Sequence, residues 1–179
     1  NLNALPMRYD KISMINIIRE FRPKGNYRMF LLKFVFFSSM EYLSVLIFIL
    51  TQFRFTIREN IAKITLISIL LSFVSFSLIG ADLRGISPLV QNAIFFIYIW
   101  IVLKVSLLNS IVMVLTGYTV YGLVQTCVVA IHAQLGMTSG VFLIGDEIGH
   151  QVQVISSSIM LLLSICTSYL NGGFSFVEN

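Results

Sequence analysis

Long apolar runs separated by short polar connections make up most of the chain. A run of about 20 apolar residues crosses the roughly 30 Å hydrocarbon core of a bilayer as an α-helix. By this criterion the sequence predicts about five spans, over residues 34–53, 64–80, 89–103, 107–131 and 151–170. The expected fold class is therefore all-α, a polytopic transmembrane helical bundle.

The apolar stretch from Leu89 to Ile131 has to be divided before it fits a membrane. As one continuous helix its 43 residues would measure about 64 Å, which is twice the hydrocarbon thickness. A polar cluster lies near its middle, between Lys104 and Ser110. We therefore expect a tight hairpin at this cluster, with the long side chain of Lys104 reaching the membrane interface.

Residues 1–33 form a basic arm ahead of the first span. Within it, apolar residues recur at roughly helical spacing from Ile12 to Phe21, and Pro23 ends the pattern. The pattern predicts a short amphipathic helix in the membrane interface, although a helix packed on a soluble partner would show the same spacing. The remainder, residues 34–179, forms the transmembrane domain. Because the chain begins with Asn and ends in a polar segment, we expect a fragment of a longer protein.

Composition supports lipid as the surrounding medium. The chain is 57% hydrophobic and 11% charged, whereas a soluble domain is about 45–50% apolar and about 25% charged. Seven of the twelve Lys and Arg residues lie within the first 33 positions. This charge favours anionic lipid head groups as partners of Arg19, Arg22, Lys24 and Arg28. Nucleic acid is not expected as a partner, because the aromatic residues lie in the apolar runs.

The distribution of positive charge predicts that the N-terminus is cytoplasmic. In that orientation the cytoplasmic segments carry eight Lys and Arg residues and the outer connections carry four. An excess of positive charge on the cytoplasmic side is typical of multi-pass proteins. Arg54, Arg58 and Lys63 lie on the outer side and oppose this bias. The short connections favour a bacterial plasma membrane.

Glu41 is the clearest candidate for a functional residue. It lies eight residues into the first predicted span, between Met40 and Tyr42. A carboxylate in hydrocarbon is costly, so we expect it to face the bundle interior. There it would bind a proton, a cation or a polar ligand, or simply accept a hydrogen bond from a neighbouring helix. We predict a ligand or proton site formed by Glu41, Tyr118, Tyr121 and Lys104, with Asn92 as a further candidate partner.

Two other pairs place reactive residue types close together. Glu147 and His150 are one helical turn apart, as in di-iron bundles, but the additional carboxylates of such a centre are not arranged for it. Asp146 fits instead as the N-cap of the last helix, and no metal site is expected. Cys127 and His132 are the components of a nucleophilic dyad, yet their five-residue spacing places them on opposite faces of a helix.

Common catalytic and nucleotide-binding motifs do not occur in the sequence. It contains no Walker A loop, no dinucleotide-binding glycine pattern, no HExxH and no GxSxG. The predicted spans carry almost no charge besides Glu41 and Lys104, which argues against an ion pump with a relay of ionisable groups. We therefore expect no cofactor and no catalytic activity in this segment.

The short-looped helices and two segments, TQFRFTIRE over residues 51–59 and TGYTVYGLVQ over residues 116–125, resemble the sensor region of certain bacterial histidine kinases. These kinases detect peptide pheromones through several membrane spans. The resemblance covers nearly the whole chain but is architectural. It implies that a kinase or other output domain follows Asn179. The phosphoacceptor histidine and ATP-binding motifs of such kinases are absent from this chain, so no site residue carries over.

These observations lead us to expect a membrane-embedded sensor that detects a peptide or hydrophobic signal and relays it to a cytoplasmic output domain. A homodimer is compatible with this role. One alternative is a small-molecule transporter, or its membrane substrate-binding subunit, with Glu41 near the midplane. Another is a membrane cysteine peptidase that uses Cys127 and His132. A purely structural subunit of a membrane complex is the fourth interpretation.

Overall fold

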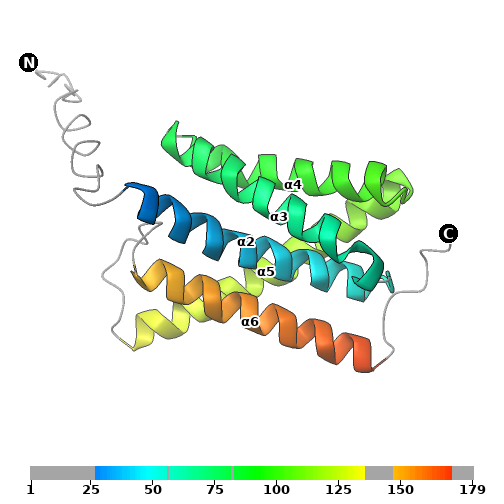
Figure 1. Ribbon diagram of the computed structural model, residues 1–179. Coiled ribbons are helices and arrows are strands. Elements are labelled where there is room, and N and C mark those ends of the chain that lie inside the picture. Colours follow the sequence, from blue (N-terminus) through cyan, green and yellow to red (C-terminus); the bar gives the residue numbers. More distant parts are fainter. Residues whose placement is uncertain (1–26, 56, 82, 136–146, 171–179) are drawn as a thin grey trace, which may run out of the picture.

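The computed structural model describes residues 27–55, 57–81, 83–135 and 147–170, and all regular structure in these ranges is helical (Figure 1). The helices are α2 (Tyr27–Gln52), α3 (Ile57–Gly80), α4 (Ser87–Ile97), α5 (Leu107–Gln134) and α6 (Glu147–Tyr169). A 3₁₀ turn, η1 (Arg84–Ile86), precedes α4, and a π-helical turn, η2 (Tyr98–Val102), continues it. The all-α bundle predicted from the sequence is confirmed.

Four of the described helices are long and apolar enough to cross a membrane. Their apolar portions are Arg28–Gln52, Ile57–Gly80, Leu107–Gln134 and Gly149–Tyr169. The apolar helix Ser87–Val102 is shorter, and at 1.5 Å per residue it measures about 24 Å, less than the roughly 30 Å of hydrocarbon. The chain therefore has the helices of a multi-pass membrane protein, and the predicted span 89–103 corresponds to a shorter helix packed among them.

The outer surface of the bundle is apolar, as a lipid environment requires. Leu66, Leu115 and Leu162, on three different helices, expose 69%, 61% and 60% of their surface. Such a surface would cause aggregation in water but matches lipid chains. In contrast, the hydroxyl-bearing residues Ser44 and Ser72 are completely buried between helices. Small polar residues at helix contacts are typical of packing within membranes.

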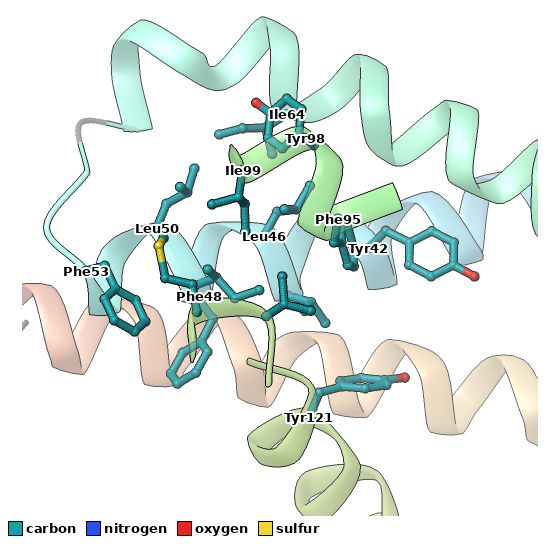
Figure 2. Close-up of a cluster of buried hydrophobic side chains, with 14 of the residues drawn as sticks. Tyr42, Leu46, Phe48, Leu50, Phe53, Ile64, Phe95, Tyr98, Ile99 and Tyr121 are labelled. Carbon is teal, nitrogen blue, oxygen red and sulfur yellow. The ribbon is translucent and has the colours of Figure 1, made fainter. Parts of the chain in front are cut away.

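Helix α2 is the centre of the bundle. It lies between α3 and α6, while α5 crosses obliquely and contacts α2, α4 and α6 (Figure 1). The apolar core forms where the helices meet, and its fully buried members include Leu46 and Leu50 of α2, Ile64 of α3, Phe95 of α4 and Ile99 of η2 (Figure 2). The core therefore fixes α2 against all of its neighbours.

Gly117 allows α5 to approach α2 closely. A Cβ atom at this position would overlap the side chain of Ile49, which is itself buried. Ile49 is β-branched at Cβ and confined by the core, so it has little freedom to move aside. The close contact between the two helices therefore depends on glycine at position 117.

Helices α2 and α3 begin earlier than the predicted spans. They start at Tyr27 and Ile57, rather than at residues 34 and 64. Arg58 and Lys63, expected in a connection, lie exposed in the first two turns of α3. Hydropathy detects the part of a helix that is matched to hydrocarbon, whereas the helix continues into the head-group layer where charged side chains are solvated.

The hairpin predicted at Lys104 is confirmed. Lys104 has a φ of 56°, and Arg54 in the α2–α3 connection has a φ of 61°, so both residues adopt the left-handed conformation. Ser106 caps α5, because its Oγ accepts a hydrogen bond from the backbone N–H of Asn109 at 3.4 Å. Both connections lie at the same end of the bundle (Figure 1).

The predicted amphipathic helix and the basic residues Arg19, Arg22 and Lys24 lie outside the described residues, as does the proposed cap Asp146. Arg28 lies in the first turn of α2 and is exposed. The contact between this basic arm and anionic lipids therefore stays a prediction.

Candidate functional site

A cavity of about 330 Å³ lies between the helices beside Glu41. All five described α-helices contribute to its wall. The lining residues are Phe34, Ser38, Glu41, Tyr42 and Val45 of α2, Ser75 and Ile79 of α3, Ser87, Pro88 and Gln91 of α4, Tyr118, Tyr121, Gly122 and Gln125 of α5, and Gln153 of α6. The cavity thus extends from the middle of α2 to the α3–α4 connection, at the end of the bundle where α2 begins (Figure 1).

Glu41 accepts hydrogen bonds from two other helices. The hydroxyl of Tyr121 on α5 donates to Oε1 over 2.6 Å, and the amide of Gln153 on α6 donates to Oε2 over 3.0 Å. Both donors are neutral, and no basic residue is found among the described residues that line the cavity. The carboxyl group therefore has polar partners but no counter-charge there.

A second set of hydrogen bonds joins α2, α3 and α4 at the cavity wall. The hydroxyls of Tyr42 and Ser75 are 2.7 Å apart. The amide of Gln91 donates to Ser75 Oγ over 2.9 Å and to Ser87 Oγ over 2.8 Å. Because hydrocarbon offers no competing water, these contacts hold the polar wall in place.

Tyr118 lines the cavity and carries an unpaired hydroxyl. Its oxygen is buried and has no hydrogen-bond partner among the described residues, while its ring packs on Phe95 with the centroids 5.4 Å apart. Buried phenol hydroxyls usually find a partner. This oxygen is therefore a position at which a bound molecule would gain a hydrogen bond.

The cavity has an apolar side, where it borders the apolar core, and a polar side. Tyr42 and Tyr121 belong to both, because their rings are part of the core and their hydroxyls point away from it in the same direction (Figure 2). Phe34, Val45 and Ile79 add apolar surface. The cavity is therefore amphipathic, with hydroxyl, amide and carboxyl groups facing aromatic and aliphatic side chains.

His150 is connected to this site by a contact with Gln153. Its Nδ1 is 3.4 Å from Oε1 of Gln153, and its ring stacks on Phe37 with the centroids 4.5 Å apart. The other end of the same Gln153 amide donates to Glu41. His150 thus helps to orient the amide that contacts the carboxyl group.

The structure brings together three of the four residues predicted for the site. Glu41, Tyr118 and Tyr121 all line the cavity. Lys104 does not, because it is exposed in the α4–α5 connection, at the opposite end of the bundle (Figure 1). Asn92 lies on α4 outside the lining, with a buried Oδ1 that lacks a partner among the described residues. A lysine at a helix end reaches the head groups more easily than the bundle interior.

Comparisons with known proteins give no family for this chain. No family model, no characterised protein and no solved structure matches it. The likeness to peptide-sensing kinases stays a prediction, and the function is argued below from the cavity and its residues.

Several residues of the site were missed from the sequence, among them Gln153, Gln91 and Ser75. Serine is common in membrane helices, so Ser75 carried no signal. The two glutamines did carry one, because an amide inside an apolar run needs partners for both its donors and its acceptor. That signal predicts a polar neighbour without identifying it.

Cys127 and His132, the catalytic pair of the peptidase alternative, do not lie side by side. Cys127 is exposed on α5, whereas His132 is buried with its Nδ1 2.9 Å from the carbonyl oxygen of Val128. The two residues therefore face different sides of the helix, and nothing in this arrangement supports a peptidase. Among the residues that the structure describes, no cluster of three His, Cys, Asp or Glu side chains could hold a metal ion.

Proposed function

We propose that this chain is the membrane-embedded sensor region of a signalling protein and that it binds a small ligand beside Glu41. The observation that supports this is a cavity walled by all five described α-helices. A molecule that fills this cavity would meet lining residues from every described α-helix. A ligand that fits one packing of the helices better than another shifts the equilibrium between them by its difference in affinity.

The size of the cavity limits what it can bind. A volume of about 330 Å³ is near the lower end of the range of about 300–1,000 Å³ that is typical of ligand pockets. It accommodates a small molecule, or one side chain of a larger one, rather than a whole peptide. We therefore narrow the expected peptide or hydrophobic signal to a small amphiphilic ligand.

Helix α6 is the element that we expect to carry the signal. Gln153 contacts Glu41 near the start of α6, and the helix then continues to Tyr169 at the opposite end of the bundle (Figure 1). A packed helix that shifts or rotates carries a displacement along its whole length. A change at Gln153 would thus reach a segment joined beyond α6. With a cytoplasmic N-terminus α6 ends on the outer side, so a cytoplasmic output domain would require a further span after it.

We place the chain in a bacterial plasma membrane with its N-terminus in the cytoplasm, because most of the positive charge precedes the first span. In that orientation the cavity lies in the cytoplasmic half of the bundle, since it extends toward the start of α2. The ligand would then arrive from the cytoplasm or from the inner leaflet. The basic arm, including Arg28, would lie against anionic lipids of the same leaflet.

A distance measurement across the far end of the bundle tests the proposal. We would place spin labels through Glu59→Cys and Ser168→Cys, after replacing Cys127 and Cys166 by alanine, and reconstitute the protein in nanodiscs. Both labelled positions are exposed and lie far from the cavity lining. The probes are benzyl alcohol and benzylammonium, which are small enough for the cavity.

We expect at least one of these probes to change the distance between the labels. The Gly122→Leu variant should lose the response, because Gly122 lines the cavity and a side chain there meets open space. An unchanged distance with both probes, or an equal response in Gly122→Leu, would contradict a ligand sensor based on this cavity.

A transporter is the second candidate, and the position of Glu41 favours it. Glu41 lies near the middle of α2, and acids at the midplane of transporters often contact the substrate. Uptake of labelled benzylammonium into proteoliposomes separates the two candidates. A transporter gives Glu41-dependent accumulation, whereas a sensor binds the probe without moving it across the membrane.

A further inference from the structure

The charge inside the cavity indicates the chemistry of its ligand. Glu41 is the one charged residue among the described residues of the lining, and its contacts are a phenol and an amide. A carboxylate that is removed from water needs an opposite charge close by, or it must hold a proton. Lys104, the basic residue expected to pair with it, lies at the other end of the bundle. The missing counter-charge can therefore come from a cation that binds in the cavity.

Glu41 retains the capacity to accept a further hydrogen bond. A carboxylate has about four lone-pair positions on its two oxygens. Tyr121 occupies one of those on Oε1 and Gln153 occupies one of those on Oε2. An ammonium group has three N–H donors, so it can bond to either oxygen without displacing Tyr121 or Gln153.

Tyr118 supplies a second acceptor in the same cavity. Its buried hydroxyl oxygen lacks a partner among the described residues. Tyr42, Tyr118, Tyr121 and Phe34 also contribute aromatic side chains to the lining. A cation close to such ring faces gains electrostatic stabilisation, and this gain increases when water is excluded. The unpaired phenol favours a cation that carries N–H donors over a fully alkylated one.

Part of the remaining wall suits an apolar body. Val45 and Ile79 line the cavity together with Phe34, and these side chains cannot replace the hydration of a second polar group. A zwitterion would bring an anionic group as well, and the described residues of the lining offer it only neutral partners because none of them is basic. The cavity therefore matches one charge at one end of a small apolar molecule.

We propose that the cavity binds a small primary ammonium compound with an apolar body, its nitrogen donating to Glu41 and Tyr118. This inference rests on the proposed function, since it assumes that the cavity is a ligand site. The competing explanation is that Glu41 holds a proton and serves only to join α2, α5 and α6. In that case the cavity would prefer neutral molecules over cations.

The test compares three matched probes on the protein in nanodiscs: benzylammonium, benzyl alcohol and benzoate. Equilibrium binding of each probe is measured on the unmodified chain, on Glu41→Gln and on Tyr118→Phe. Glu59→Gln is the control, because it makes the same chemical change on an exposed residue in the first turn of α3. Empty nanodiscs give the background partitioning of each probe into lipid.

We expect benzylammonium to bind at least about tenfold more tightly than benzyl alcohol, and benzoate not to bind. Glu41→Gln should weaken benzylammonium binding by about tenfold or more, because a charged hydrogen-bond acceptor is lost. Tyr118→Phe should weaken it by about threefold to tenfold without changing the fold, since the removed hydroxyl has no partner in the chain. Glu59→Gln should bind benzylammonium as the unmodified chain does.

Each other outcome has a defined meaning. If benzyl alcohol binds as tightly as benzylammonium and Gly122→Leu abolishes both, the cavity is a ligand site and the ammonium proposal is wrong. If none of the probes binds above the lipid background, both the ammonium proposal and the proposed ligand site are wrong. Should Glu41→Gln fail to fold, an unchanged affinity in Tyr118→Phe is sufficient to reject the proposed contact geometry.

Discussion

Tyr121 donates a hydrogen bond of 2.6 Å to Oε1 of Glu41, and this contact joins residues that are 80 positions apart in the chain. It connects α5 to the central helix α2 next to the cavity. Hydrogen bonds between membrane helices contribute about 0.6 kcal/mol on average and up to about 1.7 kcal/mol. A short bond to a carboxyl oxygen belongs near the upper part of this range.

Removing this hydroxyl should therefore destabilise the bundle. We expect Tyr121→Phe to lower the free energy of unfolding by about 1–2 kcal/mol, measured by denaturant unfolding in detergent micelles. Tyr118→Phe is the matched control, because its hydroxyl is buried without a partner among the described residues. That variant should be as stable as the unmodified chain or slightly more stable. Equal losses in both variants would mean that the contact between Tyr121 and Glu41 contributes nothing specific.

The glycines of α5 provide a second matched pair. Gly117→Ala should lower the free energy of unfolding by about 1–3 kcal/mol, because its Cβ overlaps Ile49 in a packed core. Gly122→Ala should leave stability unchanged or raise it by up to about 1 kcal/mol, since its Cβ meets open space and alanine favours the helix. The same unfolding measurement applies to both variants.

A double substitution tests the assigned cause. Ile49→Ala removes the atoms that Gly117→Ala would overlap, so the double variant should be more stable than the sum of the two single losses predicts. Additive losses would show that Gly117 matters for another reason. They would leave the close approach of α2 and α5 without an energetic role.

The sequence is sufficient to predict the helices and the buried acid, but not the contacts between them. Runs of about 20 apolar residues indicate where helices cross lipid, and a carboxylate within such a run must face inward. Helix α2, however, is apolar around its whole circumference. Its sequence therefore does not indicate which side faces α5, α6 or α3, and the contact between Glu41 and Gln153 depends on that rotation.

The error in assigning Lys104 to the site has a related explanation. Lys104 was paired with Glu41 because both are charged residues in apolar runs. The hairpin that the sequence correctly predicts at Lys104 also places it at a helix end. The predicted pair did not take into account how deep each residue lies in the membrane. Lys104 lies in a connection and cannot reach the Glu41 carboxyl group near the middle of α2.

Lys104 should instead matter for the shape of the hairpin. With a φ of 56° it adopts a conformation that glycine tolerates and β-branched residues do not. We expect Lys104→Val to lower the free energy of unfolding by about 1–2 kcal/mol and Lys104→Gly to leave it within about 0.5 kcal/mol of the unmodified chain. Binding of benzylammonium should be unchanged in Lys104→Gly. Weaker binding there would return Lys104 to the ligand site.

The orientation of the chain can be determined with single cysteines, in a background that lacks Cys127 and Cys166. Gly85→Cys lies exposed in the α3–α4 connection, where a side chain meets open space, and Glu59→Cys lies exposed at the opposite end of α3. With a cytoplasmic N-terminus, a membrane-impermeant maleimide added to intact cells should label Glu59→Cys at once. It should label Gly85→Cys only after the cells are permeabilised.

The reverse pattern would place the N-terminus and the cavity on the outer side, because the cavity extends to the same end of the bundle as the α3–α4 connection. The ligand would then have to be an extracellular ammonium compound rather than a cytoplasmic one.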